Sequence, residues 1–508
     1  MNNNNNINQE QKRQNFFKIF FETTQNIQEQ LLTRKFNSNS FSGLSIHQNQ
    51  DDKYYDQLNQ CQGDLQKFKQ IYNDQKMQKA IASFLGNAVG DALGAHTEFI
   101  NFNQTRNVIQ ENWESLIEWA QKNNHIRTKY GVITDDCSMA RCLADSLLAN
   151  NGNFNPIDIR LRFLLWWNTG YCNGSQDQRS FGLGGNISQG FGMFFRQNRP
   201  PYVFDMEKQK LGNINGNGSI MRLGTIPIAF QDDIQKGQEI AALQSLTTHN
   251  GEEAAECCRL LTFLVINLLD YKGDNPKEDI FVKKLKEFKT NCKSVEHMAL
   301  SKQEEDYQKY YNNFNRCPED RYWDWQNDKL QVSPTRVQQQ PGYFGSYCMD
   351  GTYVALYIAY HSTSQKEAIF KAVNWGGDAD SIAAVVGYIT GAMYGLEQDI
   401  WDLYNQQMVQ HDNESQLIKA IRLFNKDWVQ NTPIFKDENL EKNKDYYLEQ
   451  FTKKQNEWYP NQTIQEQNLM NKMDQDNTVS NKNKEIENSE DQNSVQNSQS
   501  QKSTQMTQ

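Results

Sequence analysis

The sequence lacks a long hydrophobic run. Its longest apolar stretch, Leu260 to Leu269, is interrupted by Thr262 and Asn267, whereas a membrane-spanning helix needs about 20 predominantly apolar residues. The stretch therefore predicts a buried helix, and we expect no membrane partner. The beginning of the chain, Met1 and the run Asn2 to Asn6, has neither the apolar core of a secretory signal nor an Arg-rich amphipathic pattern. We therefore expect an intracellular protein, cytoplasmic or nuclear.

Cysteine and histidine are too scattered to indicate a zinc site or a thiol-based active site. The nine cysteines include one adjacent pair, Cys257 and Cys258, but no Cys-x-x-Cys, and the seven histidines show no zinc-ligand spacing. We interpret the thiols as reduced. No histidine suggests a Ser-His-Asp or Cys-His catalytic pair.

Positive charge is also in short supply. The chain has 52 Lys and Arg against 62 Asp and Glu, for a formal net charge of -10, and its pI is near 5.4. Binding to nucleic-acid phosphates needs clustered Lys and Arg, and the sequence contains no such cluster. We therefore expect no direct nucleic-acid binding.

Composition divides the 508-residue chain into three parts. Residues 1–75 are rich in Asn and Gln and are interpreted as an N-terminal appendage. Residues 461–508 have a polar composition that predicts a disordered tail, because too little apolar surface is available to offset chain entropy. Residues 76–460 carry apolar residues at helical spacing, which predicts one all-α domain. Within it, residues 274–341 are charged and rich in aromatic residues, and are interpreted as an insertion and a candidate cover for a site.

Two of the predicted helices carry glycine at every fourth position. Each glycine inside a helix costs about 1 kcal/mol relative to alanine, so something must compensate. Glycines on one face allow two helix backbones to approach closely. We therefore predict that the two helices are neighbours in the core and that the groups at their ends meet. The glycines are Gly86, Gly90 and Gly94 in one helix, and Gly387, Gly391 and Gly395 in the other.

Two predicted helices begin with a pair of carboxylates and a hydroxyl. Taken singly, each set is typical of helix capping. Four carboxylates brought together would repel one another unless cations neutralised them, and oxygen ligands without His or Cys favour Mg²⁺, Mn²⁺ or Ca²⁺. Together the two sets predict a two-metal hydrolytic site. They are Thr134, Asp135 and Asp136, with Thr134 at the expected N-cap position, and Asp378, Asp380 and Ser381.

A third acidic pair lies on the first glycine-bearing helix. Asp91 and Glu98 are seven residues apart, about two helical turns, so both face one side if the helix continues. Asp91 is open to a capping or pairing role with a neighbouring helix. A carboxylate at a helix C-terminus is disfavoured by the helix dipole, and we therefore favour a functional role for Glu98.

A segment of small residues, Asn213 to Arg222, includes Gly216, Asn217 and Gly218. Small residues free backbone amides to approach an anion such as a diphosphate. Asn-Gly pairs equally indicate a plain turn, and the sequence has neither a Walker A motif nor a dinucleotide-binding fingerprint. His249 precedes a predicted helix and either caps that helix or contacts a ligand, with capping favoured.

Taken in this order, the motifs resemble the ADP-ribosylglycohydrolase family. The likeness extends from Ile81 to about Gly395 and is specific because five separated motifs occur in family order. It implies an orthogonal multi-helix bundle with a central site for two Mg²⁺ or Mn²⁺ ions, ADP-ribose in a cleft over them, and a monomer. The motifs are Gly90-Asp91-Ala92-Leu93-Gly94 with Glu98, Thr134-Asp135-Asp136, Gly216-Asn217-Gly218 with Met221-Arg222, His249, and Gly377-Asp378-Ala379-Asp380-Ser381.

The resemblance also implies roles for individual residues. Glu98 matches a glutamate beside the metals that is implicated in catalysis, and His249 matches a histidine of the substrate cleft. Ser381 stands where Thr is commoner and keeps the hydroxyl. The implied diphosphate-contacting residues are Gly216, Asn217 and Gly218. The implied metal ligands are Thr134, Asp135 and Asp136 on one side and Asp378, Asp380 and Ser381 on the other.

One segment departs from the family pattern. Where members often place an aspartate near the substrate, this chain has Phe181 to Asn186, which contains none. In arginine-directed members that acid helps with the leaving group. Its absence weakens an arginine assignment or shifts the role to Glu98, so the linkage specificity stays open.

The resemblance implies a hydrolase that cleaves the glycosidic bond between ADP-ribose and a modified protein side chain or a small ADP-ribosyl substrate. Cleavage at the anomeric carbon develops oxocarbenium character and needs an activated water and help for the leaving group. Two divalent ions and Glu98 would supply both. Two alternatives stay open: a catalytically silent ADP-ribose-binding or crystallin-like member of the fold, and a different two-metal hydrolase acting on a phosphoester.

Overall fold

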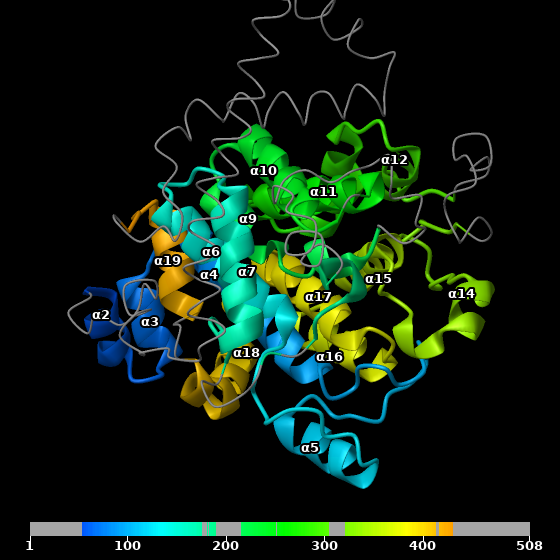
Figure 1. Ribbon diagram of the computed structural model, residues 1–508, viewed down its shortest axis with the longest axis horizontal. Helices are drawn as coiled ribbons and strands as arrows, with labels where there is room; N and C mark the ends of the chain where they lie inside the picture. The colour runs from blue at the N-terminus through cyan, green and yellow to red at the C-terminus, as the bar shows by residue number, and fades with distance from the viewer. Residues whose placement is uncertain are drawn as a thin grey trace, which may run out of the picture. The chain divides into compact units, whose positions relative to one another are not determined.

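Helices make up the described part of the protein. The computed structural model describes residues 53–174, 180, 182–188, 215–249, 251–303, 321–412 and 416–429. Within these ranges there is no β-strand, only an isolated bridge between Gly216 and Tyr347. The all-α prediction is therefore confirmed (Figure 1). No helix in the same ranges is both long enough and apolar enough to cross a membrane.

The α-helices are α2 (Lys53–Cys61), α3 (Leu65–Ile71), α4 (Gln75–Gly94), α5 (Trp113–Lys122), α6 (Asp135–Ala149), α7 (Pro156–Thr169), α9 (Ile226–Ala229), α10 (Ile234–Leu246), α11 (Glu252–Asp270), α12 (Lys293–Ala299), α14 (Pro334–Gln339), α15 (Cys348–Tyr360), α16 (Gln365–Trp375), α17 (Ala379–Tyr394), α18 (Gln398–Leu403) and α19 (Gln416–Asn425). Short 3-10 helices include η2 (Asn217–Ser219) and η3 (Leu223–Thr225), and π-helical turns span Lys277–Lys283 and Tyr404–Met408.

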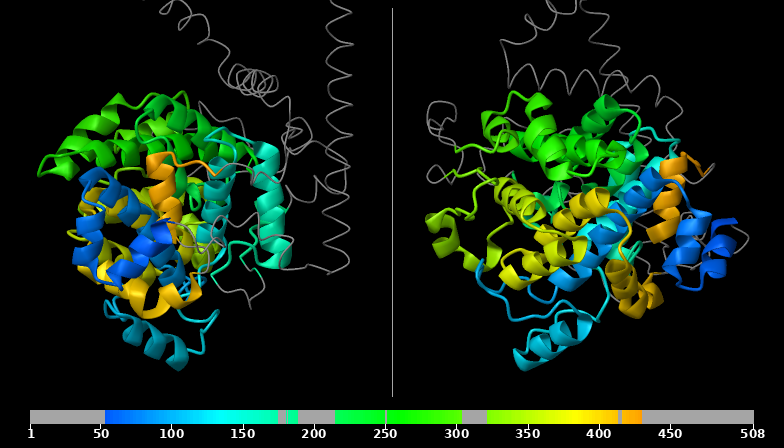
Figure 2. Two further views of the ribbon diagram at one scale, coloured as in Figure 1. Left: turned by 90° about the vertical axis from the view of Figure 1, so that its left-hand side faces the viewer. Right: turned by 180° about the vertical axis from the view of Figure 1, so that it is seen from behind.

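Helices α4 and α17, blue and yellow in Figure 2, pack against each other. The order of their contacts shows that they run antiparallel. A Cβ added at Gly86 would overlap the carbonyl of Gly387, and one added at Gly94 would lie 2.5 Å from the carbonyl oxygen of Ala379. The predicted contact between the two glycine-bearing helices is therefore confirmed. Gly395 is the exception, because it ends α17 with a φ of 76° and has only the Lys79 side chain nearby.

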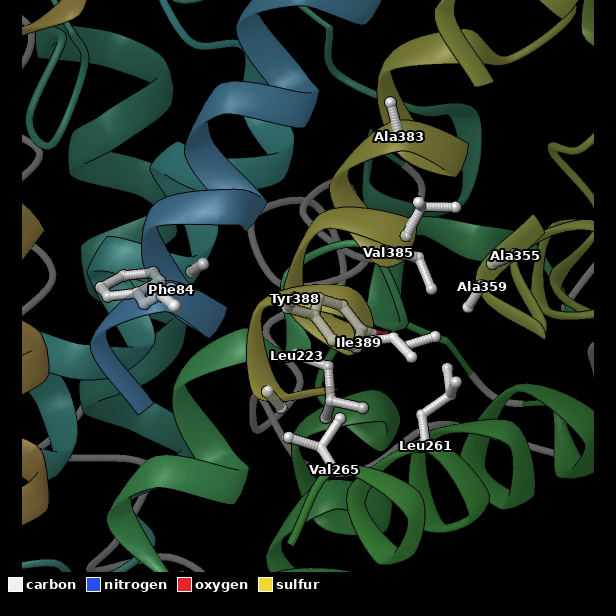
Figure 3. Close-up of a cluster of buried hydrophobic side chains, with 14 of the residues drawn as sticks. Phe84, Leu223, Leu261, Val265, Ala355, Ala359, Ala383, Val385, Tyr388 and Ile389 are labelled. Carbon is white, nitrogen blue, oxygen red and sulfur yellow. The ribbon is translucent and has the colours of Figure 1, made fainter. Parts of the chain in front are cut away.

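The core closes around α17. Side chains of Tyr388 and Ile389 on α17 meet Leu261 and Val265 on α11, beside Leu223 (Figure 3). All five residues are 0% exposed. The apolar run of α11 is thus a buried helix, as predicted from its length and its two polar interruptions.

Chain preceding residue 76 also packs onto this core. The hydroxyl of Tyr54 donates to Asp427 at 3.0 Å, the indole N–H of Trp401 donates to the Gly63 carbonyl at 2.5 Å, and the rings of Phe68 and Trp401 lie 4.7 Å apart. Residues before the predicted boundary at 75/76 therefore pack on the helical core. The boundary remains a prediction based on composition. Residues 1–52 and the predicted tail, 461–508, lie outside the described residues.

The predicted insertion, residues 274–341, is described except for 304–320. Its Trp323 and Trp325 are fully buried, and the Trp325 indole N–H donates to the Met298 carbonyl at 2.7 Å. Arg321 forms a buried ion pair with Glu253 of α11 at 2.5 Å. In the described part, these aromatic residues therefore serve packing against α11 and α12, and the covering role stays a prediction.

Candidate active site

The antiparallel contact sets the C-terminal end of α4 against the N-terminal end of α17. Asp91 lies in the last turn of α4, and the N–H of Glu98 still donates to the Gly94 carbonyl at 3.0 Å, so the helical path continues past the last residue of α4. Asp378 and Asp380 open α17. One carboxylate oxygen from each of Glu98, Asp378 and Asp380 lies within 4.8 Å of the others. The glycine contact has thereby gathered three acids at one point.

A glycine turn fixes this meeting point. Gly376 and Gly377 adopt φ of +76° and +71°, a region that side-chain-bearing residues rarely occupy. The Gly377 N–H donates to the Ile100 carbonyl at 2.8 Å, and the Gly377 carbonyl accepts from the Phe99 N–H at 2.8 Å. This reciprocal pair ties the segment after Glu98 to the residue before Asp378.

The start of α6 completes the acidic centre. The Asp91 carboxylate accepts hydrogen bonds from the backbone N–H of Thr134 at 2.9 Å and of Cys137 at 2.9 Å. Asp91 therefore caps α6, as its alternative interpretation proposed. Thr134 occupies the N-cap position but makes no side-chain capping bond; its hydroxyl donates to Asp136 at 3.1 Å. Thr134 is therefore the N-cap residue, as predicted, but the side-chain oxygens that accept from the amides at this helix start belong to Asp91.

The carboxylates repel one another in a desolvated space. Burial raises the pKa of Asp135, Asp136 and Asp380 well above the ordinary value, and neighbouring carboxylates raise each further. Burial likewise raises the pKa of Glu98 to about 8, with Asp378 adding to the shift and Arg127 opposing it. The two acidic helix starts thus act on one another, so the structure brings the two predicted sets together.

This centre fits a hard cation. Its donors are carboxylate and hydroxyl oxygens, the ligands that Mg²⁺ and Mn²⁺ prefer. The Oδ1 atom of Asp136 is buried and has no hydrogen-bond partner among the described residues. A buried carboxylate oxygen without a partner is costly, and a divalent ion would both pair it and offset the repulsion between its neighbours.

Stability of the metal-free protein is expected to fall between pH 6 and pH 8. The folded-state pKa values of the acidic centre are raised, to about 8 for Glu98 against an ordinary 4.5. In this window the folded state still holds protons that the unfolded state has lost, so the free energy of unfolding decreases as the pH rises. The melting temperature in EDTA, measured across this range, checks the sign.

Two comparisons sharpen the measurement. Excess Mg²⁺ should remove most of the decline, because the ion replaces protons at the same oxygens. An Asp136→Asn variant in EDTA should show a shallower decline than the unaltered protein. Identical pH profiles for both proteins in EDTA would contradict the clustering of the acids.

Glu98 is held from its outer side by the segment 125–127. The Glu98 carboxylate lies 3.8 Å from the Arg127 guanidinium, which also lies 4.4 Å from the centre of the Phe99 ring. The Nε2 atom of His125 is 2.9 Å from the Glu98 carbonyl oxygen. The sequence analysis missed both residues, because they carry no motif and reach Glu98 only through the fold.

The Gly216–Gly218 segment borders the acidic centre. The side-chain amide of Asn217 donates to Asp378 at 3.1 Å and to the Gly345 carbonyl at 3.2 Å. The segment forms the 3-10 helix η2 rather than a simple two-residue turn. Asn217 therefore orients a predicted metal ligand, a contact across 161 residues that sequence spacing does not reveal.

His249 lies behind the same segment and is buried. Its Nδ1 is 2.8 Å from the Thr248 hydroxyl, and its ring is close enough that a Cβ at Gly218 would lie 3.1 Å from Nε2. The N-cap residue of helix α11 is Gly251, and no side chain caps this helix. The favoured interpretation of His249 as a helix cap is therefore wrong, because its ring is committed to Thr248 and the glycine segment.

The segment that lacks the family aspartate also reaches the centre. Phe181 lies outside the described residues, but Gly182 has a φ of +88°, and a Cβ there would overlap the Asp135 carboxylate. The amide nitrogen of Asn186 would lie 2.6 Å from a Cβ at Gly216. The Gly182 backbone thus borders the Asp135 carboxylate, and the Asn186 side-chain amide borders Gly216.

Fold and site together define an all-α protein with a buried acidic centre of the kind that suits hard divalent cations. The family model described as ADP-ribosylglycohydrolase matches residues 73–428 of this chain. The protein therefore belongs to the ADP-ribosylglycohydrolase family and is a hydrolase, as the motif order predicted.

Named relatives agree with this membership. The ADP-ribosylarginine hydrolase Tri1 of Pseudomonas putida (strain GB-1) is 25% identical over 354 residues, covering 66% of this chain and 78% of that protein. The ADP-ribosyl-dinitrogen reductase glycohydrolase of Rhodospirillum rubrum is 23% identical, covering 63% and 86%. ADP-ribosylhydrolase ARH3 of Homo sapiens is 25% identical, covering 54% and 73%. A solved structure titled ADP-ribosylglycohydrolase-related protein complex aligns with a TM-score of 0.46 at 22% identity, over 69% of this chain and 99% of that one.

Proposed function

We propose that this protein is a metal-dependent ADP-ribosyl hydrolase that releases ADP-ribose from a modified protein side chain or from a small ADP-ribosyl compound. The observation that carries the proposal is the convergence of two acidic helix starts and Glu98 on one buried centre. A structural protein of the same fold has no need of an acid cluster that destabilises it, because buried like charges repel. The relatives named above act on ADP-ribosyl bonds.

The residues proposed to hold two Mg²⁺ or Mn²⁺ ions come from both helix starts. When bound, the ions would supply positive charge that orients ribose hydroxyls and makes a water more acidic. Ser381 supplies a hydroxyl at the position where Thr is commoner, and Asn217 keeps Asp378 in place through its amide. The proposed ligands are Thr134, Asp135, Asp136, Asp378, Asp380 and Ser381.

Glu98 is proposed as the residue that exchanges a proton with the attacking water or the leaving atom. Its carboxylate faces Asp378 and Asp380 on one side and Arg127 on the other, so it lies at the edge of the centre where substrate would arrive. Gly216 and Gly218 would let the diphosphate approach the backbone, and His249 would contact the same ligand from behind. We propose a monomer acting without membrane or nucleic acid.

Replacing Glu98 with Gln should lower kcat about 100- to 10,000-fold, the range typical of a lost acid-base group. The affinity of the Glu98→Gln variant for Mn²⁺ should change far less, because the six proposed metal ligands remain. Parallel measurement of kcat and of Mn²⁺ binding separates the two roles that the geometry allows. A collapse of Mn²⁺ binding in Glu98→Gln would make Glu98 a metal ligand instead of the acid-base residue.

Linkage is tested with two peptides, one carrying ADP-ribose on arginine and the other on serine. We expect Mg²⁺-dependent release of ADP-ribose from one of them, with an Asp135→Ala variant inactive on both. Release from one linkage would establish the activity and its specificity together. Tight binding of ADP-ribose without release from either peptide would favour the catalytically silent member of the fold.

A further inference from the structure

Arg222 is a fully buried arginine whose hydrogen-bond partners in the described part of the chain are all neutral. Its Nε donates to the Gln244 side chain at 2.8 Å, and its Nη2 donates to the Gln244 carbonyl at 3.0 Å and to the Thr248 hydroxyl at 2.8 Å. A buried cation without a carboxylate partner is expensive. The arrangement therefore calls for a purpose beyond packing.

The Thr248 hydroxyl links Arg222 to His249. Its oxygen lies 2.8 Å from Arg222 Nη2 and 2.8 Å from His249 Nδ1, and these are its hydrogen-bond partners among the described residues. Arginine can only donate, so the hydroxyl oxygen accepts from Arg222. The buried hydroxyl hydrogen then needs an acceptor, and His249 Nδ1 is the one available. His249 Nδ1 must therefore be unprotonated.

The remaining ring nitrogen of His249 packs against the Gly216–Gly218 segment, close to the Asn186 amide. A Cβ would lie 3.3 Å from Nε2 if built on Gly216 and 3.1 Å if built on Gly218. No described residue accepts a hydrogen bond from this nitrogen, although the histidine is only 1% exposed. A proton on Nε2 would therefore have no protein acceptor among the described residues, and it would be available to a ligand that reaches the Gly216–Gly218 segment.

We propose that Arg222 and Thr248 are positioning residues that fix His249 in the tautomer protonated on Nε2, so that this N–H donates to a phosphoryl oxygen of a substrate bound at the Gly216–Gly218 segment. The choice of ligand rests on the proposed function, whereas the tautomer does not. Arg222 forms no ion pair among the described residues, although the Asp135 carboxylate acts on it from a greater distance, so its charge also favours an anion nearby.

The local charges agree with a neutral ring. Burial, together with the nearby Arg222 guanidinium, lowers the pKa of His249 to about 3. The His249 N–H donates to the carbonyl of Ser245 in α10 at 2.8 Å. Gln244 of α10 and Thr247, which follows that helix, bond to Arg222, and none of these three residues is charged. At neutral pH the imidazole therefore carries a single proton, and the hydrogen-bond chain places it.

The tautomer is measured directly by long-range ¹H–¹⁵N correlation on the full-length protein labelled with ¹⁵N-histidine. A His249→Gln variant identifies the resonances by their loss. We expect the unaltered protein and Thr248→Ser to show one tautomer, protonated on Nε2. In Thr248→Val the Nδ1 resonance should move, because the ring loses its hydrogen-bond donor. Protonation on Nδ1 in the unaltered protein, or unchanged resonances in Thr248→Val, would overturn the proposal.

Binding of ADP-ribose in Mg²⁺, followed by calorimetry, tests the consequence. Thr248→Val should bind about tenfold more weakly, the usual effect of one misdirected hydrogen bond, while Thr248→Ser keeps the hydroxyl and should match the unaltered protein. His249→Gln, whose amide N–H can reach the Nε2 position, should bind more tightly than His249→Asn. Equal affinities of Thr248→Val and Thr248→Ser would overturn the positioning role.

Failure of the proposed function is distinguishable from failure of this inference. If the unaltered protein bound no ADP-ribose but showed the Nε2 tautomer and its dependence on Thr248, the positioning role of Arg222 and Thr248 would stand and the ligand assignment would fall. If ADP-ribose bound and an ADP-ribosyl bond was hydrolysed while His249 was protonated on Nδ1, the proposed function would stand and the positioning role of Arg222 and Thr248 would fall.

Discussion

An Asp378→Ala variant is expected to lose ADP-ribosyl hydrolysis by at least about 1,000-fold, equivalent to the several kcal/mol that metal-assisted charge stabilisation provides. Asp378 opens α17, lies within 4.8 Å of the Glu98 and Asp380 oxygens, and receives the Asn217 amide at 3.1 Å. Its removal deletes a proposed metal ligand and leaves the Asn217 side-chain amide without this acceptor. The initial rate of Mg²⁺-dependent ADP-ribose release measures the loss.

The same variant separates loss of function from loss of fold. Asp378 is one of several buried carboxylates that raise one another's pKa, so deleting it should not lower the melting temperature in EDTA. An Asp328→Ala variant changes the same residue type at an exposed position and should keep full activity. Retention of full metal-assisted activity by Asp378→Ala would contradict the proposed metal centre.

A Gly90→Ala variant is expected to lose about 3 kcal/mol of the free energy of unfolding, at the upper end for overpacked cores. A Cβ at Gly90 would overlap the Ala383 carbonyl group and lie 2.9 Å from the Ala384 nitrogen. These are backbone atoms of α17, so relief requires the helices to separate. Alanine's better helix propensity, about 1 kcal/mol, offsets only part of this cost. Urea unfolding measures the difference.

Separation of α4 and α17 should also reduce activity, because the two ends at this contact carry Glu98 and Asp378. Gly185→Ala is the matched control: a Cβ there has no atom within 4 Å, so stability should be nearly unchanged. Gly90→Ala with the stability of Gly185→Ala would show that the helices do not approach as closely as described.

Much of the fold and site followed from local patterns. The four-residue glycine spacing predicted the α4–α17 contact, and a carboxylate pair at two helix starts predicted the acidic centre. Each depended on residues close in sequence whose periodicity has a direct physical meaning. Gly395 extended the glycine pattern but serves as the end of a helix, where its φ of 76° matters more than its spacing.

The sequence alone could not decide between the partners open to Asp91 and His249. Asp91 caps a helix 43 residues later in the chain, and this leaves the Thr134 hydroxyl for Asp136 instead of the helix end. His249 was expected to cap the helix that follows it. Its ring is instead bonded to the hydroxyl of the preceding residue, Thr248, which accepts a hydrogen bond from the distant Arg222. Which partner a backbone amide or a ring nitrogen obtains depends on which group the packing of the helices places within hydrogen-bond distance.

The central claim, that the acidic centre holds the ions on which hydrolysis depends, is tested by titrating Mn²⁺ into EDTA-stripped protein. Bound Mn²⁺ and the rate of ADP-ribose release are measured in the same samples, on whichever linkage is cleaved. We predict that activity is absent without metal and rises as about two ions bind per chain. Full activity in EDTA, or saturation with Mn²⁺ that leaves the rate unchanged, would contradict the account.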